Sequence, residues 1–182
     1  MIKICIVAPF EYPIPAIKGG ALEQVVESIC SVNEKHKKLE ITVLATYDSE
    51  LKENHFQYTD FVYFKKSKWD KCWFFLFRVI KKKFKKYIPA YSRMIKVKKW
   101  LEKHETEYDF IVYEDGLTYM LPFLFKKISR KKIVSHLHWV GDPDKKSSQY
   151  ISTLIPVSEF VGKEWNRKCH NSDIDIKYLI LK

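Results

Sequence analysis

The sequence predicts an α/β fold in which helices flank a Rossmann-like open parallel sheet. Two observations support this fold class: short apolar runs rich in Ile and Val recur along the chain, and segments of helical periodicity separate them. Continuous apolar runs are typical of strands that are buried on both faces, as in parallel sheets. The chain has 182 residues, 46% of them hydrophobic, which suits a single domain over residues 1–182 with its own core.

Seven segments are predicted to be strands because each is short, apolar and bounded by polar or turn residues. The first is IKICIVA, which ends at Pro9. In chain order the predicted strands are residues 2–8, 40–46, 61–64, 109–114, 132–138, 152–158 and 176–181. Strands that alternate with helices in this way are joined by right-handed crossovers.

Helices are predicted between these strands. The first follows a glycine pair, and its apolar stripe at spacing i, i+3, i+4 and i+7 consists of Leu22, Val25, Val26 and Ile29. We expect this helix to end before NEKHKK, and we expect its solvent-facing side to hold Glu23, Gln24 and Glu27. Further helices are predicted over residues 69–87, 91–105, 117–128 and 159–168.

The net charge of +11 is concentrated in one part of the chain. Residues 65–99 hold fourteen Lys or Arg and a single acid, Asp70, whereas the rest of the chain holds nineteen basic and twenty-one acidic residues. This segment is predicted to form a basic, aromatic helical insertion over residues 65–105, interrupted at Pro89. The basic character of the protein is therefore local.

The cysteines and the hydropathy pattern limit the class of protein. Cys5, Cys30, Cys72 and Cys169 lie far apart without a CxxC pair or zinc-type Cys/His spacing, so we expect reduced thiols and no metal. No run reaches the roughly 18 uncharged apolar residues of a membrane-spanning helix, and the N-terminus lacks a signal-peptide pattern. We therefore expect a cytoplasmic chain.

The carboxyl ends of the strands are where ligands gather in open α/β sheets. Four of these ends carry polar or glycine residues: Gly19–Gly20, Glu114-Asp115-Gly116, His136 with His138, and Ser158-Glu159. The glycine loop is not a dinucleotide or P-loop motif, because GxGxxG and GxxxxGK[ST] are both absent. Its glycines either allow close approach of an anion to a helix N-terminus or only turn a long loop into a helix.

Each of the other candidates has a structural alternative. Glu23 is favoured in a first helical turn whatever the function, and an acid before Gly116 is ordinary turn chemistry. His136 is the rival of His138 for any catalytic role because side chains two apart on a strand point the same way, and either can be a structural histidine. Ser158 is most simply the N-cap of the following helix.

Four segments, in this order, resemble the N-terminal half of a GT-B glycosyltransferase of the retaining family 4. They are APFEYP…KGGALEQVV, YEDG, IVSHLHW and IPVSEFVGKEW, and the similarity spans nearly the whole chain. The resemblance implies that Gly19 and Gly20 face the donor diphosphate and that His138 is the catalytic histidine near the transferred sugar. It further implies an acceptor site, to which we assign Glu23, Glu114, Asp115 and His136.

The resemblance also implies a missing partner. The chain stops at IKYLILK, about where a second, donor-binding domain would begin, and the carboxylates that bind the nucleotide and the sugar in that domain have no counterpart. We therefore expect a hexosyl-type glycosyltransferase, with a nucleotide-sugar as donor substrate and no cofactor. We also expect it to be incomplete or inactive alone, without a separate or missing C-terminal half. The alternative is a non-catalytic basic module that binds a membrane or nucleic acid.

The basic segment WDKCWFFLFRVIKKKFKKY predicts a helix that lies on an anionic membrane, the inner face in a cytoplasmic protein. The residues assigned to this surface are Trp69, Trp73, Phe77, Lys81, Lys82 and Lys83. Such a helix fits a saccharide acceptor carried on a lipid, as in polysaccharide or glycolipid synthesis. The alternatives are a solvated basic face over an aromatic core, or a nucleic-acid surface, but no helix-turn-helix, RNP or zinc-finger motif supports the latter, so we expect no nucleic-acid partner.

Overall fold

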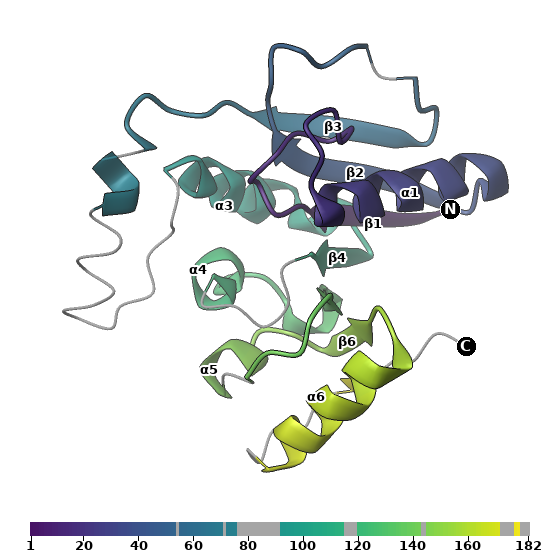
Figure 1. Cartoon of the computed structure of the whole chain (residues 1–182), viewed down its shortest axis with the longest axis vertical. Coiled ribbons are helices and arrows are strands. Elements are labelled where there is room, and N and C mark those ends of the chain that lie inside the picture. The colour runs from purple at the N-terminus through teal and green to yellow at the C-terminus, as the bar shows by residue number, and fades with distance from the viewer. Residues whose placement is uncertain are drawn as a thin grey trace.

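The structure is a computed structural model that describes residues 1–53, 55–70, 72–75, 92–114, 120–142, 145–171 and 177–178 (Figure 1). Within these residues the chain forms one sheet of seven strands, ordered β3-β2-β1-β4-β5-β6-β7, and every pairing is parallel. The strands are β1 Ile2–Val7, β2 Leu39–Thr46, β3 Thr59–Phe64, β4 Phe110–Tyr113, β5 Ile133–Leu137, β6 Thr153–Pro156 and β7 Lys177–Tyr178. The predicted α/β class with an open parallel sheet is confirmed.

The strand order reverses between β1 and β4. From β1 the chain adds β2 and β3 on one side of the sheet, and then it returns to pair β4 with the other side of β1. Such a reversal leaves a crevice at the carboxyl ends of the two central strands, which is the usual ligand site of a doubly wound sheet. The segments that follow β1 and β4 are therefore the first places to search for function.

Helices cover both faces of this sheet. They are α1 Ala21–His36, α3 Arg93–His104, α4 Leu121–Phe125, α5 Lys145–Ser148 and α6 Glu159–Asn171, with short 3-10 turns at Glu105–Glu107 and Arg130–Lys132. Helix α4 is shorter than the predicted 117–128, α6 is longer than the predicted 159–168, and the four-residue α5 has no predicted counterpart. Of the predicted helix 69–87, the described helical part is Asp70 and residues 72–75.

The two faces of the sheet have separate apolar cores. Along β1, Ile6 and Ala8 join a core with Val26 and Cys30 of α1, whereas Cys5 and Val7 join the opposite core, which includes residues of α3, α4 and α6. Successive side chains of a strand point to opposite faces, so β1 is buried on both. This explains why residues 4–8 are continuously apolar, whereas Lys3, near the start of the strand, is exposed.

The solvent-facing side predicted for α1 is wrong at Glu23. The buried positions of α1 are Glu23, Val26, Cys30 and Asn33, and Glu23 is only 3% exposed. The proline-containing loop before the helix supplies the partner that makes this burial possible, because the backbone N–H of Tyr12 donates to Glu23 Oε1 at 3.2 Å. A long loop that folds back over its own helix leaves no periodic signal in the sequence.

The cysteines are free thiols, as predicted. Cys5, Cys30 and Cys169 are buried, whereas Cys72 is exposed. Burial raises the pKa of the Cys5 thiol, and it raises that of Cys30 to about 12, so both are inert in the core. Within the described part of the chain, the helices fall short of the length and apolar content that crossing a membrane requires.

Candidate functional site

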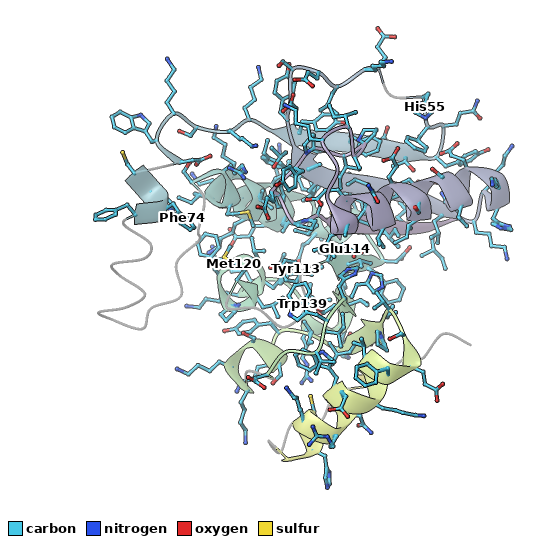
Figure 2. The ribbon with its side chains drawn as sticks, viewed as in Figure 1. His55, Phe74, Tyr113, Glu114, Met120 and Trp139 are labelled. Atoms are coloured by element: carbon cyan, nitrogen blue, oxygen red, sulfur yellow. The ribbon has the colours of Figure 1, made fainter. Side chains whose placement is uncertain are left out.

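The site at the strand reversal is built by the ends of β4 and β5. The backbone N–H of Glu114, the residue after β4, donates to the carbonyl of Val7 at 3.1 Å, which keeps Glu114 in line with β1. Strands β4 and β5 pair in the register Tyr113 with Ser135, so the next residues along, Glu114 and His136, are neighbours. Figure 2 places Glu114 near the middle of the molecule, beside Tyr113.

One carboxylate oxygen holds two imidazoles at this point. Glu114 Oε2 lies 2.8 Å from His136 Nδ1 and 2.9 Å from His138 Nε2. The Glu114 side chain is fully buried, whereas the two histidine side chains keep 14% and 7% of their surface exposed. His136 and His138 point the same way because they are two apart at the end of one strand, and their ring centroids are 4.4 Å apart.

The protonation of this cluster follows from its geometry. Burial alone would raise the pKa of Glu114, but the hydrogen bonds from His136 and His138 outweigh it and lower that pKa. The carboxylate is therefore ionised and can only accept, so His136 donates through Nδ1–H and His138 through Nε2–H. In the neutral imidazoles the lone pairs are then on His136 Nε2 and His138 Nδ1, which remain available to a ligand.

The second carboxylate oxygen of Glu114, Oε1, differs from Oε2 in its hydrogen bonding. Glu114 Oε1 is buried and has no hydrogen-bond partner among the described residues. Buried acceptors in folded proteins are nearly always satisfied, so an orphaned carboxylate oxygen needs an explanation. Together the three side chains present two imidazoles and one anionic oxygen at the carboxyl edge of the sheet, a set suited to hydrogen bonding with hydroxyls, to proton transfer or to cation binding.

The glycine pair turns the loop into α1. Both glycines have positive φ, 78° for Gly19 and 95° for Gly20, which residues with a Cβ rarely adopt. A Cβ on Gly20 would overlap Glu23 Oε2, whereas a Cβ on Gly19 would meet nothing within 4 Å. The N–H of Gly19 donates to Ala16 at 3.0 Å. The turn role is thus present in the structure, and contact with a donor diphosphate stays a prediction.

Acidic residues of α1 hold the loop in place. Glu23 accepts from the Tyr12 N–H, and Glu27 Oε2 accepts from the Ala16 N–H at 2.8 Å. The Glu23 carboxylate is therefore engaged with backbone in the first turn of the helix. The contact of Glu23 with a sugar acceptor stays a prediction.

Some of the remaining predicted residues lie outside the described part of the chain, and the others are away from the Glu114 cluster or act as a helix cap. Asp115, Phe77, Lys81, Lys82 and Lys83 lie outside the described residues. Trp69 is 72% exposed and Trp73 is half-buried, and Figure 2 shows the neighbouring Phe74 at the edge of the molecule, well away from Glu114. Ser158 Oγ accepts from the Val161 N–H at 3.3 Å, as an N-cap does.

A pocket beside the described part of the basic segment was not predicted from the sequence. It has a volume of about 510 Å³, and its lining includes Tyr12, Lys66, Asp70, Phe74 and Arg93. Arg93 is 3% exposed and pairs with Asp70 at 2.6 Å, although its position in a basic run suggests a surface residue. The sequence feature that could have indicated this buried ion pair is Asp70, the single acid of the segment 65–99.

Comparison with known proteins supports the fold. No protein-family model matches the chain, and no curated protein matches it either. Among solved structures, the chain is similar to sucrose-phosphate synthase (tll1590) from Thermosynechococcus elongatus, with a TM-score of 0.58 and 9% sequence identity. The similarity covers 98% of this chain and 47% of that one. The chain thus has a GT-B-like, Rossmann-type fold and spans about half the length of that synthase.

Proposed function

We propose that this chain is the acceptor-binding half of a glycosyltransferase of the retaining family 4 type, with a nucleotide-sugar as donor. The observation that carries the proposal is the cluster of Glu114, His136 and His138 at the reversal of strand order in a GT-B-like half. A sugar acceptor offers hydroxyl groups, and imidazoles with fixed tautomers recognise hydroxyls in one orientation.

The two histidines have the direct roles in this proposal. His138 lies near the transferred sugar, where its Nδ1 lone pair accepts from a sugar hydroxyl or the ring stabilises developing charge. His136 presents Nε2 toward the acceptor. Glu114 is fully buried and holds both rings, so we assign it a positioning role for acceptor binding. Asp115, the next residue along, remains a proposed acceptor contact.

The donor is bound mainly by a second half. Gly19 and Gly20 open α1 toward the crevice, and the first N–H groups of a helix favour an anion such as the diphosphate of a nucleotide-sugar. The similar synthase is about twice as long as this chain, which supports a donor-binding half supplied by a separate subunit or by further polypeptide. No cofactor is needed for sugar transfer from such a donor.

The test is a transfer assay with a reconstituted enzyme. The chain is mixed with a candidate donor-binding half, and transfer of labelled sugar from a panel of nucleotide-sugars to a lipid extract is measured. We expect His138→Ala to lower the rate about 100-fold or more, while His104→Ala, on the surface of α3, keeps the wild-type rate. Equal rates for the two variants would contradict the proposed role of His138.

We further propose that the basic aromatic segment docks on an anionic membrane, at the inner face, and so brings a lipid-linked acceptor of polysaccharide or glycolipid synthesis to the site. Trp69 and Phe75 are 72% and 70% exposed, and Lys65, Lys66 and Lys68 are exposed beside them. Exposed aromatic rings next to lysines suit the boundary between head groups and acyl chains. Phe77, Lys81, Lys82 and Lys83 are assigned to this surface from the sequence and lie outside the described residues.

Sedimentation with liposomes tests this docking. Binding to vesicles with phosphatidylserine is expected to exceed binding to neutral vesicles, and Trp69→Ala with Phe75→Ala should weaken it severalfold. Equal sedimentation with both vesicle types would contradict the membrane proposal. Filter binding of single-stranded nucleic acid that falls steeply as salt rises, without sedimentation on either vesicle type, would favour the nucleic-acid alternative instead.

A further inference from the structure

We propose that Glu114, His136 and His138 form a binding site for one divalent transition-metal ion, with Zn²⁺ as the preferred ion. Each residue offers one ligand atom, and these atoms all lie within 4.8 Å of one another. Sugar transfer as proposed above requires no metal, so this inference goes beyond that function. It also departs from the absence of a metal expected from the spacing of Cys and His in the sequence.

The ligand set is the first argument. Two imidazole nitrogens and one carboxylate oxygen are the protein ligands of many zinc sites that keep a fourth position open for water or substrate. Ligands about 2.0 Å from a tetrahedral ion are about 3.3 Å apart. Glu114 Oε2 lies 2.8 and 2.9 Å from the two nitrogens, so a small outward movement of the rings accommodates the ion.

The orphaned oxygen is the second, independent argument. Glu114 is fully buried, and its Oε1 has no hydrogen-bond partner within the described residues. Two histidine N–H groups satisfy Oε2 only, whereas a cation bound at Oε2 would also offset the negative charge that Oε1 shares. A dication also offsets the cost of burying the negative charge of Glu114.

The scaffold is the third argument. His136 lies in β5, and Glu114 and His138 directly follow β4 and β5, whose backbones are hydrogen-bonded to each other in a fixed register. Sites on paired strands are held more precisely than sites on loops. The rings of His136 and His138 keep part of their surface exposed, and the fourth position of the ion would lie on that exposed side.

Metal binding would exchange the histidine tautomers. Without the ion, His136 carries its proton on Nδ1 and His138 on Nε2, because both donate to Glu114. A bound ion takes the lone pair of those same nitrogens. Each neutral ring must then carry its proton on the other nitrogen, His136 Nε2 and His138 Nδ1. These two nitrogens accept from a sugar hydroxyl in the metal-free protein, whereas with the ion bound they would donate to it, so the exchange is itself a signature of the site.

Calorimetric titration of the purified chain with ZnCl₂ tests the proposal. Cys72 has an exposed thiol that can bind zinc by itself, so the Cys72→Ser variant serves as the parent protein. We expect one Zn²⁺ per chain, with weaker binding of Mn²⁺ and Mg²⁺, which prefer oxygen ligands. His136→Gln and Glu114→Gln should each weaken zinc binding by about tenfold or more.

A matched control separates this site from surface chelation. His104 and Glu107 form a His–Glu pair at 2.8 Å on the surface, and His104→Gln in the same parent should bind zinc as the parent does. Absence of binding by the parent, or equal binding by His136→Gln and the parent, would overturn the proposal. None of these measurements depends on sugar transfer, so failure here leaves the proposed function in place.

Nitrogen-15 NMR of the histidine rings decides the question without any variant at the site. Addition of ZnCl₂ to the parent protein should exchange the protonated and unprotonated ring nitrogens of His136 and His138 and leave those of His104 unchanged. If the variants fail to fold, this measurement remains. Unchanged tautomers at saturating zinc would overturn the site.

Discussion

Two buried glutamates follow adjacent strands of the sheet and have different partners. Glu23, in the first turn of helix α1 that follows β1, and Glu114, the residue after β4, are 3% and 0% exposed. Glu23 accepts from a backbone N–H, whereas Glu114 accepts from two imidazoles. The Tyr12 N–H does not titrate and is already bonded to Glu23, so this contact fixes a loop. Imidazoles can titrate and bind a ligand, so Glu114 belongs to a chemical site.

The largest expected effect is on stability. Glu114→Ala removes the acceptor of two buried N–H groups and should lower the free energy of unfolding by about 3 kcal/mol. Glu23→Ala leaves one backbone N–H unsatisfied and should lower it by about 1.5 kcal/mol. Urea denaturation followed by circular dichroism measures both. A larger loss for Glu23→Ala would show that the loop, rather than the cluster, dominates the stability of this edge.

The second effect is on catalysis, and it distinguishes a structural role of a buried glutamate from a role in sugar transfer. In the reconstituted transfer assay, Glu114→Gln should lower kcat about 100-fold, equivalent to about 2.7 kcal/mol, because an amide no longer fixes both histidine tautomers. Its pH–rate profile should shift as well, which a purely structural change would not cause. Glu23→Gln should change kcat less than tenfold with the same profile as wild type. Similar kcat losses for the two variants would remove the distinction between them.

The third effect tests the close approach of the Glu23 carboxylate to the backbone of Gly20. Gly20→Ala should cost about 2 kcal/mol, because φ is positive and the new methyl group overlaps the Glu23 carboxylate. Gly19→Ala is the matched control with positive φ and open space, and it should cost about 1 kcal/mol.

A double variant isolates the contact at Gly20. Gly20→Ala with Glu23→Ala should destabilise the chain less than the sum of the single changes, since the overlap is then gone. Additive losses in urea denaturation would mean that the carboxylate moves aside without cost.

The contrast between the glutamates also shows what the sequence could predict. Each of the seven strands in the described part of the chain overlaps a predicted segment, because short apolar runs bounded by polar residues indicate strands. The two histidines were placed together because of their spacing along one strand. The burial of Glu23 was missed, because its partner is a backbone N–H eleven residues earlier, in a loop without periodicity. Glu114 and the histidines were identified separately, but their shared oxygen depends on the register of β4 and β5.

The smallest expected effect is the pH dependence that Glu114 contributes. Its pKa is lower in the folded chain than its ordinary value of 4.5: burial opposes ionisation, but hydrogen bonds from His136 and His138 outweigh it. An unfolded chain therefore binds this proton more readily, so the stabilisation is complete above pH 4.5 and is lost as the pH falls through the folded pKa. Urea denaturation at pH 6, 5, 4 and 3 should show the unfolding free energies of wild type and Glu114→Gln converging toward low pH. A constant difference across this range would mean that the Glu114 carboxyl does not change its protonation on unfolding, and the two buried glutamates would then differ only in their partners.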